Sequence, residues 1–122
     1  MASELGNLTD HRLETRLSEL RDQAAMHAEA EAKRIYLENF KHSKLALLMK
    51  KAEQAGVTTV AAQEREARAD PEFIELLEGL RHATEVAEKN KWLLRIALQG
   101  SSLYQTQQAN LRAEIKAYGS AP

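Results

Sequence analysis

Apolar residues recur at intervals of three and four along two long stretches of the chain, which is the spacing of one face of an α-helix. In the first stretch they form a narrow stripe: Leu13, Leu17, Leu20, Ala24, Ala28, Ala32 and Ile35. Thr9 and Asp10 favour a helix start there, because a hydroxyl caps free amide groups and an acid suits the positive end of the helix dipole. No proline or glycine follows until Gly56, which supplies a stop. The pattern predicts a long helix over about residues 10–54.

The chain over residues 56–70 predicts a connector with a short helix of its own, since its sequence favours helix and either Thr58 or Thr59 can cap it. Asp70 followed by Pro71 then predicts a sharp boundary. Asp is a good N-cap, and Pro fits the first position of a helix.

A second long helix is predicted over about residues 71–118, with Gly119 ending it. Its seam residues form two stripes: Phe73, Leu77, Leu80, Thr84, Ala87, Leu94 and Leu98 in the first, and Tyr104, Gln108, Leu111, Ile115 and Tyr118 in the second. The stripes are out of phase near Gly100, which stands beside two serines. A helix can kink or change partner at such a point.

Two long helices and a short connector predict an all-α fold: one helical domain over residues 1–122, folded as a long antiparallel hairpin. The composition agrees, because 29% of residues are charged and only 5% are aromatic. The formal charge alternates from −4 over residues 1–31 to +5 over 32–52, −6 over 53–88 and +4 over 89–122. Antiparallel pairing sets blocks of opposite sign side by side.

The apolar residues near Trp92 wrap most of the helix circumference, so one neighbouring helix does not cover them. We therefore expect a homo-oligomer held together by Trp92, Leu93 and Ile96.

Several classes of function are excluded or disfavoured. The absence of cysteine excludes disulfides, thiolate nucleophiles and cysteine-based zinc sites. No apolar run reaches the ~18 residues of a membrane helix, and the first residues do not predict a secretory signal. The P-loop, the dinucleotide glycine pattern, the His-Glu-x-x-His motif and a nucleophile turn are also missing. We expect a protein that is not an enzyme, needs no cofactor and is not attached to a membrane.

One metal hypothesis stays open beside the interpretation as ordinary surface contacts. Glu38 and His42 stand four residues apart, as do Glu78 and His82, and the predicted hairpin can bring the two pairs together. The di-iron bundles use a spacing of three and four helices instead. Our prediction is therefore no metal site.

A basic row offers a more direct function. Its members fall within about 100° of arc over roughly 25 Å, with one more at the tip: Arg34, Lys41, Lys44 and Lys51, with Lys50 beside the connector. Such a row can follow a nucleic-acid backbone without base-specific hydrogen bonds. The alternative is pairing within the chain, with Glu72, Glu75, Glu78, Glu85 and Glu88.

Basic residues also surround Trp92, which could stack on a base if it were exposed. The aliphatic residues next to it favour a core position instead.

Several segments occur in an order that resembles a known family: Lys44-Leu45-Ala46-Leu47-Leu48-Met49-Lys50-Lys51-Ala52-Glu53, Gln63-Glu64-Arg65-Glu66-Ala67, Pro71-Glu72-Phe73, Leu76-Leu77-Glu78-Gly79-Leu80 and Lys91-Trp92. Over roughly residues 35–118 the chain resembles the phage recombination mediators, the UvsY-like small helical proteins that bind single-stranded DNA.

The resemblance implies a ring-shaped homo-oligomer that helps a recombinase displace single-strand-binding protein from the strand, in the cytoplasm of a bacterial host cell. The family's basic motif corresponds to Lys50 and Lys51, and its assembly region to residues 92–97. The chain departs from the family where Tyr104 is followed by Gln105 instead of Arg, so a contact by that Arg does not carry over. A structural or adaptor oligomer, such as a virion assembly chaperone that binds no DNA, is the alternative.

Overall fold

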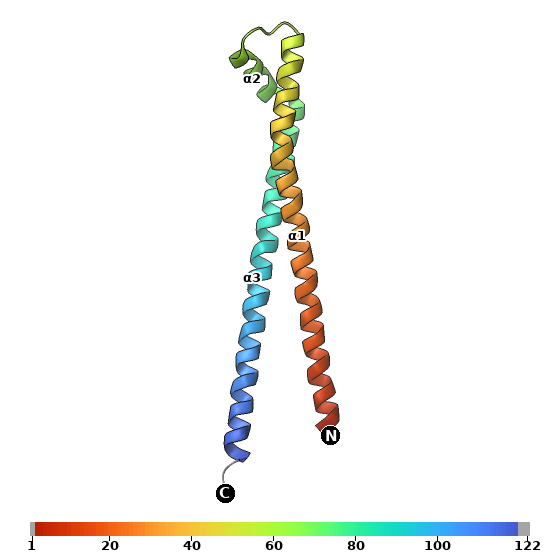
Figure 1. The fold of residues 1–122 in the computed structure, drawn as a ribbon, viewed down its shortest axis with the longest axis vertical. Coiled ribbons are helices and arrows are strands. Elements are labelled where there is room, and N and C mark those ends of the chain that lie inside the picture. Colours follow the sequence, from red (N-terminus) through yellow and green to blue (C-terminus); the bar gives the residue numbers. More distant parts are fainter. Residues whose placement is uncertain (1, 120–122) are drawn as a thin grey trace. The chain divides into compact units, whose positions relative to one another are not determined.

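The computed structural model describes the backbone of residues 2–119 and the side chains of residues 10–118. It contains three helices: α1 (Ala2–Gln54), α2 (Val60–Ala69) and α3 (Pro71–Gly119) (Figure 1). The described part of the chain holds no strand, so the all-α prediction is confirmed. No helix in that part is long and apolar enough to cross a membrane.

The first helix begins earlier than the sequence pattern predicts. α1 starts at Ala2, and the predicted cap Thr9 lies inside it. A cap residue favours a helix start but does not impose one, and residues 2–8 contain no proline and only one glycine. The backbone can therefore continue as helix through the predicted boundary.

Gly56 ends α1 as predicted, in a backbone conformation that glycine adopts readily. Its φ is +101°, in the left-handed region, where a side chain would be strained. The amide of Gly56 donates to the carbonyl of Glu53 (3.1 Å), and the amide of Val57 donates to that of Ala52 (3.0 Å). This pair of bonds is the Schellman motif, which satisfies carbonyl groups that the helix end leaves unpaired.

The two later helices start where the sequence predicts. The Oγ1 of Thr59 accepts a hydrogen bond from the amide of Ala62 (3.2 Å), so Thr59 rather than Thr58 caps α2. Asp70 caps α3, because its Oδ1 accepts from the amide of Glu72 (2.9 Å).

The chain packs as two compact units, each of which we describe separately: residues 27–90, the connector unit, and residues 1–26 with 91–122, the terminal unit. In the connector unit, α2 folds back beside the end of α1 (Figure 1). A small core forms where Leu48 of α1, Ala67 of α2 and Phe73 of α3 meet, with Leu45 and Met49 packed against it. Phe73 is only 2% exposed, so the connector helix is anchored by this core.

The buried faces of the long helices differ from the predicted stripes. One row of covered positions on α1, which we call its seam, alternates steps of three and four: Leu20, Gln23, His27, Ala30, Arg34, Leu37, Lys41, Lys44 and Leu48. Glu31, Glu38, Leu45, Met49 and Ala52 beside this row are also partly covered. Of the predicted stripe, only Leu20 belongs to this set, and the rest is exposed. The seam of α1 is instead lined largely by long polar side chains, whose alkyl stems can cover apolar surface while their polar ends reach water.

α3 carries a single seam rather than two stripes that are out of phase. Its covered residues keep the alternating spacing from Phe73 to Gln108: Phe73, Leu76, Leu80, Ala83, Ala87, Asn90, Leu94, Ala97, Ser101, Tyr104 and Gln108. The predicted Leu77, Thr84 and Leu98 are exposed. A strict period of 3.5 is the pattern of coiled-coil packing, and α3 continues as α-helix through Gly100. The predicted change of phase is therefore wrong.

Candidate nucleic-acid interface

Three of the five predicted DNA-binding cations have carboxylate partners. Arg34 donates to Glu31, one turn away on α1, and this hydrogen bond and charge raise the pKa of Arg34 above its ordinary value. The Nζ of Lys41 lies 3.1 Å from an Oε of Glu38, also on α1.

Of these three ion pairs, the one made by Lys44 joins two helices. Its Nζ lies 2.8 Å from Oε2 of Glu72 at the start of α3. The basic row is therefore divided, because its first three members sit half-buried along the seam of α1 and face acids of this chain. For Lys44 the partner is one of the glutamates expected under the alternative of internal pairing.

Lys50 and Lys51 differ from these three. Both side chains are exposed in the last turns of α1, and neither makes an ion pair within the part of the chain that the structure describes. Lys51 borders a hollow of about 180 Å³ between α1 and α2, whose lining also includes Glu66 and Asp70. An ammonium in the last turn also interacts favourably with the negative end of the helix dipole. These two lysines are the members of the row that remain available to an external anion.

The residues of the metal hypothesis do not form a recognisable site. Glu38 pairs with Lys41, and Glu78 pairs with Arg81 at 3.1 Å. Among the described side chains, no group of three or more histidines and acids is arranged to hold a metal ion.

Trp92 is not in the core of this chain, contrary to the expectation from its aliphatic neighbours. It is 55% exposed, and the guanidinium of Arg95 lies 5.0 Å from the centre of its ring. Leu93 and Ile96 are also exposed. Of the other aliphatic residues nearby, Leu94 and Ala97 belong to the covered seam of α3, so the aliphatic neighbours do not enclose Trp92.

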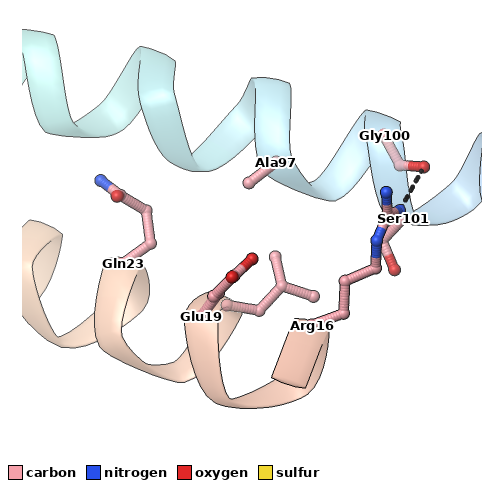
Figure 2. A pocket seen from close by; sticks show the side chains of 7 residues that line it. Arg16, Glu19, Gln23, Ala97, Gly100 and Ser101 are labelled. Atoms are coloured by element: carbon pink, nitrogen blue, oxygen red, sulfur yellow. Dashed lines mark hydrogen bonds between the residues drawn. The ribbon is translucent and has the colours of Figure 1, made fainter. Parts of the chain in front are cut away.

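A second cluster, which the sequence pattern did not reveal, surrounds Tyr104 in the terminal unit. The guanidinium of Arg16 on α1 lies 4.8 Å from the centre of the Tyr104 ring on α3. Its NH1 donates to the carbonyl oxygen of Gly100 (3.2 Å) (Figure 2). Contacts between residues 84 or more positions apart leave no local spacing pattern, so this cluster becomes visible only in the structure.

Comparison of the chain with protein-family models, with curated proteins and with solved structures finds no match.

Proposed function

We propose that this chain is a non-catalytic protein that binds single-stranded DNA and acts as a phage-type recombination mediator in the cytoplasm of a bacterial host cell. One observation carries the DNA-binding part of this proposal: Lys50 and Lys51 are adjacent, exposed and without a carboxylate partner among the described residues. Glu53 lies on the same helix end, and Glu66 and Asp70 line the hollow that Lys51 borders. None of these acids forms an ion pair with Lys50 or Lys51 in the part of the chain that the structure describes.

Phosphate contacts need cations that are exposed and not held by a carboxylate, and Lys50 and Lys51 meet both conditions among the described residues. Each lysine that neutralises a phosphate releases a counterion, which gives binding energy without base-specific contacts. Two lysines form a weak site on their own. An oligomer repeats the site, and a strand that spans several copies binds far more tightly than it binds one.

We propose that each copy of the chain folds as a long antiparallel hairpin. Within the connector unit, Lys44 near the end of α1 pairs with Glu72 near the start of α3. Within the terminal unit, Arg16 near the start of α1 contacts Gly100 in the later part of α3. The two segments run in opposite directions in each unit, which supports a hairpin for the whole chain.

The exposed apolar residues of α3 support a homo-oligomer. Trp92, Ile96 and Leu103 are spaced i, i+4 and i+11, so they share one face, and all three are more than half exposed. They lie on the side of the helix opposite its covered seam. Residues 96–111 carry no charge at all in a chain with 29% charged residues. We assign this face, with Leu93 beside it, to contacts between copies.

The mediator role follows from the family resemblance. In this role the oligomer holds the strand extended and presents it to a recombinase while single-strand-binding protein is displaced. No bond is made or broken, and no cofactor is needed.

Replacement of both free lysines tests DNA binding. We expect Lys50→Ala with Lys51→Ala to weaken binding to a fluorescent oligo-dT strand and to flatten its salt dependence. Loss of two phosphate contacts lowers the slope of log K against log salt by about 1.4, which over a fourfold rise in salt is roughly a sevenfold difference. The measurement is fluorescence anisotropy at several salt concentrations.

A matched variant, Lys33→Ala with Lys116→Ala, removes the same charge from exposed positions outside the proposed site. It serves as the control, and mass photometry checks that the oligomer is intact in both variants. Equal affinity and slope in the Lys50 and Lys51 variant and in the control would exclude these lysines from a DNA site.

A structural or adaptor oligomer without DNA binding is the second candidate. The ion pairs of Arg34, Lys41 and Lys44 favour it, because these charges are already used within the chain. An unmodified protein that assembles but does not bind oligo-dT at low salt would establish this alternative.

A further inference from the structure

The ring of Tyr104 in the terminal unit contacts the guanidinium of Arg16 and borders two hollows with different linings. The guanidinium of Arg16 lies 4.8 Å from the centre of the ring. Its hydrogen bond to the carbonyl oxygen of Gly100 orients the guanidinium (Figure 2). Arg16 contributes to a hollow of about 340 Å³, together with His11, Arg12, Thr15 and Glu19.

The second hollow that Tyr104 borders has a different lining. It measures about 540 Å³ and is formed by Leu13 from α1 and Tyr104, Gln105, Gln108 and Arg112 from α3. Arg16 does not line this hollow, so its guanidinium leaves the hollow open, and the guanidinium that borders it is that of Arg112. The volume lies within the ~300–1,000 Å³ that is usual for sites of small organic groups.

The side chains that line this second hollow are of four chemical kinds. They combine an aromatic ring, an aliphatic side chain, two primary amides and one guanidinium. Arg112 donates from Nε to the carbonyl oxygen of Gln108 (3.3 Å), which leaves its terminal nitrogens free of any hydrogen bond among the described residues. An aromatic ring with amides beside it suits a flat heterocycle with polar edges, and a nearby guanidinium suits a phosphate.

We propose that this hollow holds one nucleobase of a single DNA strand. Tyr104 stacks on the base, the amides of Gln105 and Gln108 bond to its polar edge, and Arg112 contacts the adjacent phosphate. The proposal rests on single-stranded DNA binding and adds to it a base contact that is distinct from the phosphate contacts of Lys50 and Lys51.

Arg16 acts in this site as a positioning residue. Its guanidinium attracts the electron-rich face of the ring, and its bond to the Gly100 carbonyl links α1 to α3 behind Tyr104. The ring is therefore held before the strand arrives, which lowers the entropy lost on binding. Because every base has a flat face, the site discriminates weakly between sequences.

A strand that lacks bases separates this site from the phosphate contacts. We expect Tyr104→Ala to weaken binding to oligo-dT about tenfold, within the ~5- to 150-fold range of one stacking contact. Tyr104→Phe retains the ring, so it should bind oligo-dT as the unmodified protein does. An abasic strand of equal length should bind the unmodified protein more weakly, and Tyr104→Ala should not weaken it further.

Helix content by circular dichroism and the oligomer mass confirm that Tyr104→Ala is folded. As a second variant, Arg112→Gln should lower affinity for both strands and reduce the salt slope, because it removes a phosphate contact.

The outcomes distinguish this site from the function on which it rests. Unchanged binding of oligo-dT by Tyr104→Ala, or an equal loss on both strands, overturns the base site while DNA binding stands. If the unmodified protein binds neither strand, DNA binding itself fails, and the base site fails with it. The last experiment is a titration with dTMP, in which binding is monitored by the NMR signals of the Tyr104 ring. Saturable binding there without strand binding assigns the hollow to a free nucleotide and overturns the strand proposal.

Discussion

Replacement of His27 by Leu is expected to stabilise the fold. His27 occupies a seam position of α1 in the connector unit, and its Nδ1 is buried without a hydrogen-bond partner among the described residues. A buried polar atom that loses its water and gains no partner destabilises the folded state. Leu removes the polar atom and adds apolar surface at a position that already faces the neighbouring helix.

The size of the effect follows from two contributions. An unpaired buried polar group costs about 1–3 kcal/mol, and Leu has a helix propensity a few tenths of a kcal/mol better than His. We therefore expect the free energy of unfolding to rise by roughly 1–3 kcal/mol. For a chain of this length that corresponds to about 3–6 °C in Tm for each kcal/mol.

His42→Leu is the matched control, because His42 is on the same helix and exposed. This substitution changes helix propensity by the same amount, but it removes no buried nitrogen atom. Urea and thermal unfolding followed by circular dichroism, at one protomer concentration for all variants, measures the difference. If both variants shift the free energy of unfolding equally, the unpaired Nδ1 of His27 has no energetic cost, and the reasoning behind this prediction is refuted.

Two further predictions concern the core and the proposed contact face. Phe73→Ala is expected to lower the free energy of unfolding by about 3–5 kcal/mol, because the ring is almost fully buried against Leu48 and Ala67; thermal melts measure the loss, and a change below 1 kcal/mol would show that this core does not anchor α2. Trp92→Ser is expected to reduce the oligomer mass measured by sedimentation, with helix content maintained, whereas an unchanged mass would remove Trp92 from the contacts between copies.

Local chemistry made the helix boundaries predictable. Each boundary residue acts through its own backbone or through an amide two or three residues away: Gly56, Thr59 and Asp70. Their effect therefore depends only on neighbouring residues in the sequence. The start of α1 was not predictable in the same way. Thr9 offers a cap, but nothing in the residues before it prevents the helix from continuing.

The seam was harder to predict because hydrophobicity alone does not mark it. On α1 it passes through Gln23, His27, Arg34 and Lys41, while Leu13 and Leu17 lie outside it. Which face is covered depends on the partner helix, and a polar residue with a long alkyl stem covers the seam as well as a small apolar one. On α3 the seam keeps a 3.5-residue spacing, but Asn90, Ser101 and Gln108 interrupt its apolar residues, so an apolar stripe alone does not trace it.

The candidate DNA site was predictable only in part. Charge counts identified the basic row, but they do not distinguish a paired lysine from a free one. The pairing of Lys44 with Glu72 depends on residues 28 positions apart, whereas the freedom of Lys50 and Lys51 depends on what does not lie near them. The cluster at Tyr104 was not predictable for the same reason, because Arg16 and Tyr104 are far apart in the sequence.

The distribution of apolar side chains bears on the form of the proposed oligomer. A second exposed stripe lies on α1 in the connector unit, where Tyr36, Phe40 and Leu47 are exposed and the rings of Tyr36 and Phe40 stack 6.0 Å apart. Its spacing of i, i+4 and i+11 is the same as that of Trp92, Ile96 and Leu103 on α3. On α1 the chain thus leaves large apolar side chains on an outer face, while polar residues such as Gln23, Arg34 and Lys41 occupy the seam. This is the reverse of what would stabilise that helix in a single copy. Each apolar side chain contributes about 1.5–3 kcal/mol when it becomes fully buried, so covering both stripes favours assembly strongly.

Because the two stripes differ in composition and belong to different helices, a contact that joins one to the other is heterologous, and such contacts close into rings when the rotation between copies permits.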